Sequence, residues 1–221
     1  PSVGPFYGAM MDQAKILKHY DFPTVMILPS RDMTTSIGIA NGIMRFVDYF
    51  GKPVVLYIKN DGYIGINEAS TLMEEGLLSF IKYAIVRKDP SQDPFLEELV
   101  KNLGNDRIVS GMGEQPVPIH KIQFDLKSFT SGCVCIAPGL STKMLKALQK
   151  EDMSRVESIR RKFEVLEELR NEINPVRVLH AAVKMTNLAE TGPLQPMINE
   201  ISGSEAARVE KAAMDLLDQE E

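Results

Sequence analysis

Short apolar segments alternate, along the first 150 residues, with longer segments in which apolar residues recur every three or four positions. The short segments are almost continuously apolar, which is typical of strands buried on both faces of a parallel sheet. Their alternation with helix-like segments indicates repeated β/α units. The predicted strands are residues 2–4, 24–28, 53–58, 83–87, 106–109 and 132–136. The predicted helices that follow them are residues 8–20, 34–49, 67–76, 94–103, 116–126 and 142–150.

Residues 151–221 contain no strand-like segment. Apolar residues at steps of three and four predict a long amphipathic helix over 154–173. Asn174-Pro175 then marks a boundary, because Pro is favoured in the first turn of a helix. Further helices are predicted over 176–188 and 204–217. We therefore divide the chain into a β/α domain, 1–150, and a C-terminal extension of three helices, 151–221.

Charged residues are dense on the predicted helix 154–173. Arg160, Arg161 and Lys162 are followed by Glu164, Glu167 and Glu168. We interpret this cluster as a solvated helix face or a subunit contact.

The composition is that of an ordinary globular protein, with 44% hydrophobic and 25% charged residues among 221. The net charge of −5 argues against a nucleic-acid partner, because phosphate binding needs a basic face. No apolar stretch is long enough to span a membrane, and the first residues lack the pattern of a signal peptide. Two cysteines do not make a disulfide framework. We expect a cytoplasmic protein with no nucleic-acid or membrane partner.

The sequence also gives no sign of a metal or cofactor site. Cys133 and Cys135 have no accompanying His or Cys that would complete a zinc set. No glycine-rich phosphate-binding motif occurs. We therefore expect neither a metal nor a cofactor, which disfavours a nucleotide-dependent enzyme.

Two residues near predicted strand ends are candidates for catalysis. Lys88 follows the apolar segment Tyr83–Arg87. In β/α folds, catalytic residues lie at the C-terminal ends of the strands. Apolar surroundings favour the uncharged amine, which attacks a carbonyl to form a Schiff base. Tyr57 lies near the end of 53–58, where a phenol could relay a proton. Position alone favours the other interpretation of each residue: a Lys88 that points into water, and a Tyr57 that caps the core with its hydroxyl at the surface.

Five short motifs follow one another along the chain: Leu56–Ile58, Val86–Ser91, Ser110–Glu114, Gly132–Met144 and Asn174–Arg177. In this order they resemble the dihydrodipicolinate synthase / N-acetylneuraminate lyase family, which are class I Schiff-base aldolases. The resemblance implies an α/β fold of the TIM (β/α)8 barrel type, with barrel strands 3–8 in this chain, followed by the helical extension. Because such a barrel takes about 250 residues, we interpret the sequence as the C-terminal three quarters of a chain of about 300.

The resemblance also implies roles for individual residues. Lys88 would form an imine with the keto carbon of a 2-oxo acid such as pyruvate, and Tyr57 would carry the proton. Gly111 would leave room at the ligand, and Glu114 would contact a hydroxyl of a sugar acid. Ile136 is a further residue that we expect to bind the substrate. A homotetramer, built as a dimer of dimers, is the implied assembly.

The sequence departs from the synthase pattern in two places. No Arg follows Tyr57 within residues 59–65, although synthases use one there to bind the second substrate's carboxylate. Arg31 stands near the place of a tyrosine that synthases share across a dimer contact. Arg31 or Lys59 could instead hold a carboxylate of another substrate. These departures argue against strict dihydrodipicolinate synthase activity. They leave two hypotheses: a lyase, aldolase or dehydratase acting on pyruvate or a keto-deoxy sugar acid, or a catalytically impaired relative that binds a small acid or serves in assembly.

Overall fold

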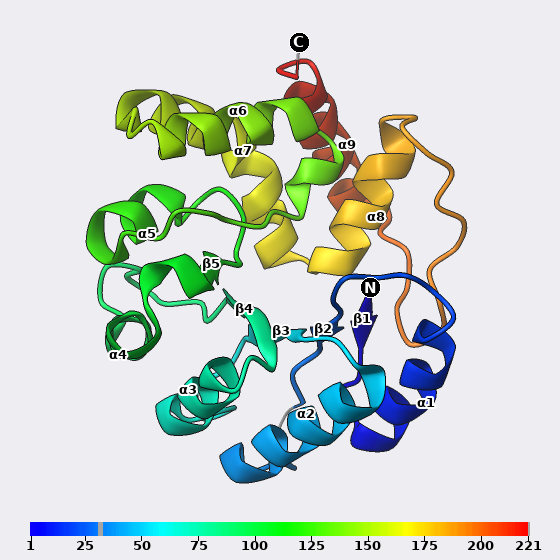
Figure 1. Cartoon of the computed structure of the whole chain (residues 1–221). Coiled ribbons are helices and arrows are strands. Elements are labelled where there is room, and N and C mark those ends of the chain that lie inside the picture. The colour runs from blue at the N-terminus through cyan, green and yellow to red at the C-terminus, as the bar shows by residue number, and fades with distance from the viewer. Residues whose placement is uncertain (31–32, 221) are drawn as a thin grey trace. The chain divides into compact units, whose positions relative to one another are not determined.

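The computed structural model describes residues 1–30 and 33–220, and its strands form one parallel sheet (Figure 1). The order of the sheet is β1-β2-β3-β4-β5, so each strand pairs with its neighbours in sequence. Each strand is followed by a helix, which confirms the predicted α/β architecture. The strands are β1 (Ser2–Val3), β2 (Met26–Ile27), β3 (Val54–Ile58), β4 (Leu78–Tyr83) and β5 (Ile108–Ser110).

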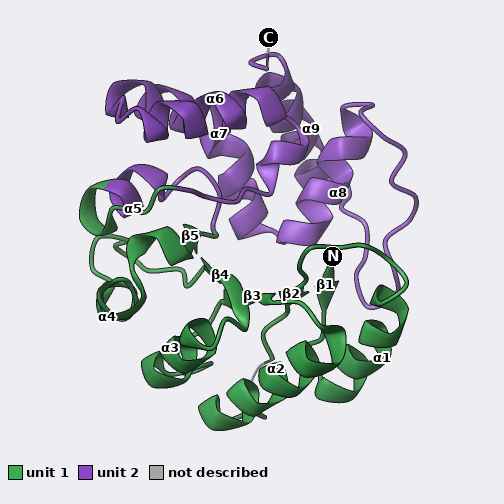
Figure 2. Cartoon of the chain, viewed as in Figure 1, with its two compact units in different colours: residues 1–111, 122–127 green, residues 112–121, 128–221 purple. Residues whose placement is uncertain are grey.

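The chain divides into two compact units, which Figure 2 shows in different colours. Unit 1 consists of residues 1–111 and 122–127, and unit 2 of residues 112–121 and 128–221. This division differs from the predicted one at residue 150. The reason is that α6 (Pro138–Gln149) buries its apolar residues in the same core as α7 (Met153–Glu172), the first helix of the predicted extension.

Unit 1 contains the sheet and the helices that follow its strands. These helices are α1 (Tyr7–Leu17), α2 (Ser36–Phe50), α3 (Ile66–Glu74) and α4 (Pro94–Leu103), with the short 3-10 helix η1 (Asn105–Arg107) before β5. Leu56 and Ile58 of β3 are fully buried in the core that these helices share with the sheet. Since side chains alternate along a strand, Tyr57 points to the opposite face of the sheet.

Unit 2 is helical. It contains η2 (Cys133–Cys135), α6, α7, α8 (Pro175–Met185) and α9 (Gly203–Leu217), whereas α5 (Val117–Phe124) contributes residues to both units. The three predicted C-terminal helices are confirmed. The boundary at Asn174-Pro175 is confirmed as well, because the Asn174 side chain accepts hydrogen bonds from the backbone N–H groups of Val176 and Arg177. In the described part of the chain, no helix is long and apolar enough to cross a membrane.

The sixth predicted strand, residues 132–136, is wrong, because this segment contains the 3-10 helix η2. Its backbone groups are satisfied locally: Ile136 N–H donates to the Cys133 carbonyl, and Val134 N–H donates to the Ser131 hydroxyl. Cys133 and Ile136 are buried in the helical core of unit 2. The apolar run therefore reflects burial among helices, and periodicity alone does not separate that from burial in a sheet.

Candidate active site

Lys82 and Tyr57 form a pair on neighbouring strands of unit 1. The parallel register of β3 and β4 places Tyr57 opposite Lys82, so both side chains point to the same face of the sheet. The Lys82 Nζ atom lies 4.6 Å from the centroid of the Tyr57 ring. Both side chains are half-buried. An amine and a phenol thus meet near the C-terminal ends of two parallel strands, where β/α folds place their chemistry.

Gly111 lies against the side chain of Lys82. The Gly111 N–H donates to the Tyr83 carbonyl at 2.6 Å, which fixes the glycine beside the end of β4. A Cβ atom at position 111 would lie 2.8 Å from Lys82 Cγ and 2.8 Å from the Tyr83 carbonyl oxygen. Any side chain here would therefore displace the lysine or the strand. In the structure, the space beside Gly111 is occupied by the Lys82 side chain. From the sequence, we expected this space to be left for a ligand.

The structural premise for Lys88 is wrong. β4 ends at Tyr83, so residues 84–87 are not a strand, and Lys88 lies five residues beyond it with an exposed side chain. The strand ends there because its partner β3 ends at Ile58, whose carbonyl accepts the last hydrogen bond, from Ala84 N–H. Lys82, which lies on β4, was not among the residues that the sequence singled out.

Arg87 connects the loops that follow β3 and β4. Its Nη1 and Nη2 atoms donate to the two carboxylate oxygens of Asp61 at 2.7 and 2.8 Å. Its Nε atom lies 3.0 Å from Asp93, which is 3% exposed and caps α4 through the Leu96 N–H. These bonds hold the pKa of the Asp61 carboxyl below its usual value. The two loops beyond the amine and the phenol are thereby joined by one guanidinium.

Tyr83 extends this network into the core. Its hydroxyl donates to Asp93, and the residue is fully buried. Burial, and next the hydrogen bond with Asp93, raise the pKa of the Tyr83 phenol. The phenol therefore remains protonated and donates to the carboxylate. The end of β4, one residue beyond Lys82, is held to the start of α4 by this bond.

Replacing Arg87 by lysine is expected to lower the free energy of unfolding by about 1.5–3 kcal/mol, because a lysine cannot make the bidentate bond to Asp61 while facing Asp93. Urea denaturation measures this change. Lys88→Arg is the matched control: the side chain is exposed, so the substitution should change stability by less than about 0.5 kcal/mol. Equal stabilities of the two variants would show that the network adds nothing.

The remaining predicted binding residues are placed differently. Glu114 lies in unit 2, is fully buried, and its carboxylate oxygens accept hydrogen bonds from Ser131 at 2.6 Å and Ser141 at 2.7 Å. Ile136 is 1% exposed and packs in the core of unit 2. Arg31 lies outside the described residues. Glu114 and Ile136 therefore have structural contacts that the sequence did not predict. Within the described chain, no group of three or more His, Cys, Asp or Glu residues could hold a metal ion.

Glu167 corrects the prediction of a solvated charged helix face. It is fully buried, and its two carboxylate oxygens accept hydrogen bonds from the backbone N–H groups of Glu114 and Gln115, both at 3.0 Å. Gly113 has φ +95° and passes so close that a Cβ atom there would lie 1.7 Å from Glu167 Oε1. Burial, and next the charge of Glu114, raise the pKa of Glu167 to about 8, against a smaller opposing effect of Arg170. The buried Glu167 side chain thus holds the backbone of the loop that follows β5 in place.

The parallel sheet in sequence order, with a helix after each strand, places the chain in the class of (β/α) barrel folds. Solved structures give the particular fold. Dihydrodipicolinate synthase from Bacillus clausii matches with a TM-score of 0.81 and 23% identity, over 99% of this chain and 72% of its own. Sialic acid aldolase from Ruminococcus gnavus matches with a TM-score of 0.80 and 15% identity, over 98% of this chain and 73% of its own. N-acetylneuraminate lyase from Fusobacterium nucleatum matches with a TM-score of 0.76 and 13% identity, over 98% of this chain and 72% of its own.

At these identities the matches establish the fold. The chain has the TIM-barrel fold of dihydrodipicolinate synthase and N-acetylneuraminate lyase, over a little under three quarters of their length. The resemblance stated from the sequence motifs is confirmed to that extent. No family model and no curated protein matches the chain.

Proposed function

We propose that this chain belongs to a Schiff-base-forming aldolase or lyase that acts on pyruvate or a related 2-oxo acid, with the imine on Lys82. The observation that carries the proposal is the Lys82 amine 4.6 Å from the centre of the Tyr57 ring, at paired positions of two parallel strands. The motif resemblance and the shared fold support it. Solved structures of that fold include proteins named as an aldolase and a lyase.

The proposed chemistry follows from these two groups. The uncharged Lys82 amine attacks the keto carbon of the 2-oxo acid, and the carbinolamine loses water to give the imine. Tyr57 stands opposite Lys82 on the same face of the sheet, and in the proposal it carries the proton that the departing oxygen requires. Gly111 leaves the space in which the lysine side chain is held. The imine then acts as the electron sink for bond cleavage or formation at the neighbouring carbon.

Reductive trapping tests the proposal. The 221-residue chain is incubated with pyruvate and sodium borohydride, digested, and examined by mass spectrometry. Hydride adds to the imine carbon, so the modified lysine gains the mass of pyruvic acid less one oxygen atom. We expect this adduct on the peptide that contains Lys82. A folded chain without any adduct would favour the other hypothesis, a catalytically impaired protein that binds a small acid or serves in assembly.

We also propose that the protein assembles into a homotetramer, as its resemblance to the family implies. Large apolar side chains on the surface of unit 1 support this: Ile16 is 61% exposed and Tyr20 59%. Exposed apolar side chains of this size are typical of surfaces that bind another protein when they lie together. Cytoplasmic localisation stays a prediction from the sequence.

A further inference from the structure

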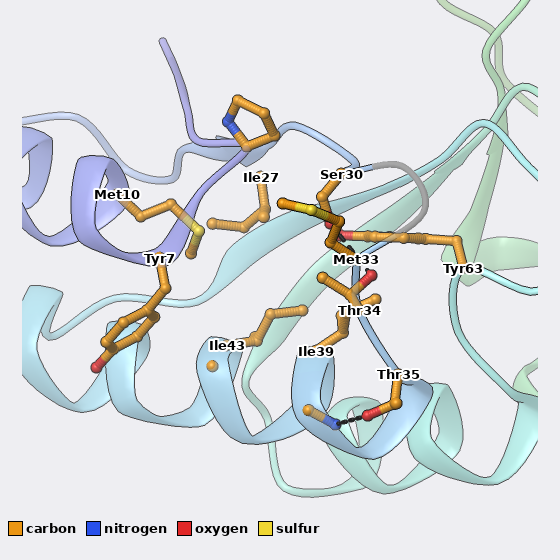
Figure 3. Close-up of a pocket in the computed structure, with 13 residues that line it drawn as sticks. Tyr7, Met10, Ile27, Ser30, Met33, Thr34, Thr35, Ile39, Ile43 and Tyr63 are labelled. Carbon is orange, nitrogen blue, oxygen red and sulfur yellow. Dashed lines mark hydrogen bonds between the residues drawn. The ribbon is translucent and has the colours of Figure 1, made fainter.

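Unit 1 contains a cavity of about 490 Å3 next to the helix layer (Figure 3). Its walls come from α1, β2, α2 and the loop that follows β3. Ile27 is on β2, Met10 on α1, and Ile39 and Ile43 on α2, and all four are buried apolar residues. A cavity of this volume with mostly apolar walls is in the range that holds small molecules.

Two glycines keep the α2 wall of the cavity open. Gly38 and Gly42 are four residues apart, so they share one face of the helix, and both line the cavity. A Cβ atom at Gly42 would have Tyr7 Cδ2 as its nearest neighbour, at 3.7 Å, which is an ordinary contact distance. A side chain at position 42 would therefore fit sterically at its first atom, and a longer one would enter the cavity.

One end of the cavity carries hydroxyl groups. The Ser30 hydroxyl donates to the Thr34 hydroxyl at 3.3 Å, and the Thr35 hydroxyl caps α2 by accepting from Gly38 N–H. Tyr63 is 6% exposed, and Figure 3 shows its ring extending toward Ser30 and Met33. Burial raises the pKa of Tyr63 to about 12, so the phenol is a neutral hydrogen-bonding group. Polar groups of this kind orient a ligand.

No charged side chain is among the described residues that line the cavity. A buried ion without a partner is costly, so the described lining residues offer a charged ligand nothing to offset the loss of its water. The hydroxyl groups, in contrast, both donate and accept hydrogen bonds. The walls thus suit an aliphatic chain that ends in an uncharged polar group. Met10 and Met33 add flexible side chains that adapt to the outline of such a chain.

From these features we propose that the cavity between α1 and α2 binds a small uncharged amphipathic molecule, an aliphatic alcohol or carbonyl compound with its polar end at Ser30, Thr34 and Tyr63. This site is separate from the pair of Lys82 and Tyr57. Ile27 pairs with Leu56 in the sheet and points to the helix side, whereas Lys82 and Tyr57 point to the other face.

Calorimetric titration with 1-hexanol tests the proposal. The wild-type chain is expected to bind 1-hexanol saturably at one site, and to bind hexanoate at neutral pH at least about 10-fold more weakly, because its charge has no partner among the described residues that line the cavity. Gly42→Leu fills the cavity and should abolish binding. Tyr63→Phe removes one neutral hydrogen bond and should weaken binding about 3- to 10-fold.

Gly8→Leu is the matched control, because Gly8 lies on α1 with no neighbouring atom within 4 Å of an added Cβ. It should bind 1-hexanol as the wild type does. Both leucine variants replace glycine in a helix by a better helix former, so their thermal unfolding should not fall below that of the wild type. The proposal is overturned if the wild type shows no saturable binding, if hexanoate binds equally well, or if a folded Gly42→Leu chain keeps its affinity. It is also overturned if sedimentation shows that a second copy fills the cavity, as a dimer that Gly42→Leu dissociates and 1-hexanol does not.

Discussion

The Lys82→Ala chain should form no borohydride-stable adduct with pyruvate, whereas Lys88→Ala should form as much as the wild type. The reason is placement. Lys82 lies at the end of β4, on the same face as Tyr57 and in contact with Gly111. Lys88 lies five residues beyond the end of β4, and its side chain is exposed to solvent.

A second variant separates loss of the amine from loss of the fold. Lys82→Arg keeps a cation over the Tyr57 ring and an aliphatic stem beside Gly111, but a guanidinium does not form an imine. It should remain folded by circular dichroism and still give no adduct. Mass spectrometry of the four chains after borohydride treatment measures the outcome. An adduct that survives in Lys82→Ala, or disappears in Lys88→Ala, would contradict the assignment and return Lys88 to the site.

The second large effect is expected at Glu167. Its pKa is about 8 in the folded chain, against an ordinary value of 4.5. Between these values the folded state keeps a proton that the unfolded state has lost, so the free energy of unfolding falls as the pH rises. The fall is on the order of 5 kcal/mol, from about 1.36 kcal/mol for each pH unit of the shift. The contribution is fully present below pH 4.5 and is lost by about pH 8.

Glu167→Gln should remove most of this slope. The amide cannot ionise, and its one oxygen can accept from one of the two backbone N–H groups that donate to the carboxylate. Urea denaturation of the wild type and the variant, at several pH values between 4.5 and 8, measures the difference. Glu168→Gln, whose side chain is exposed on the same helix, should keep the wild-type slope. Parallel slopes in wild type and Glu167→Gln would mean that the proton is held elsewhere.

The parts of the fold that the sequence predicts best have strong local signals. Asn174-Pro175 begins α8, and Asp93-Pro94 begins α4, because a capping side chain and a proline favour the first turn whatever packs around them. The segment 53–58 predicts β3 well because its apolar run ends at polar residues. The segment 132–136 is equally apolar but forms η2, since its burial comes from the helices α6, α7 and α8.

The candidate site was predicted in part. Tyr57 is on a strand end as expected, and Gly111 lies beside Lys82, but the lysine that the structure pairs with Tyr57 stands six residues before the predicted Lys88. The apolar segment continues through residues 84–86 after β4 has ended, so the run of apolar residues gave no mark at Tyr83. The end of β4 at Tyr83 is determined by its pairing with β3, and the local sequence pattern does not predict that pairing. Glu167 was missed for a similar reason, because the local pattern groups it with charged residues such as the exposed Glu168, whereas its partners come from the loop at 114–115.

The pairing of every strand with its sequence neighbour bears on how the chain acquires its structure during synthesis. β2 follows β1 by one helix, and the same interval separates each later pair. A strand that leaves the ribosome therefore finds its partner already made, and the sheet of unit 1 can grow by one strand at a time from the N-terminal side. Such stepwise growth keeps the loops that must be closed short, which lowers the entropy cost of each addition.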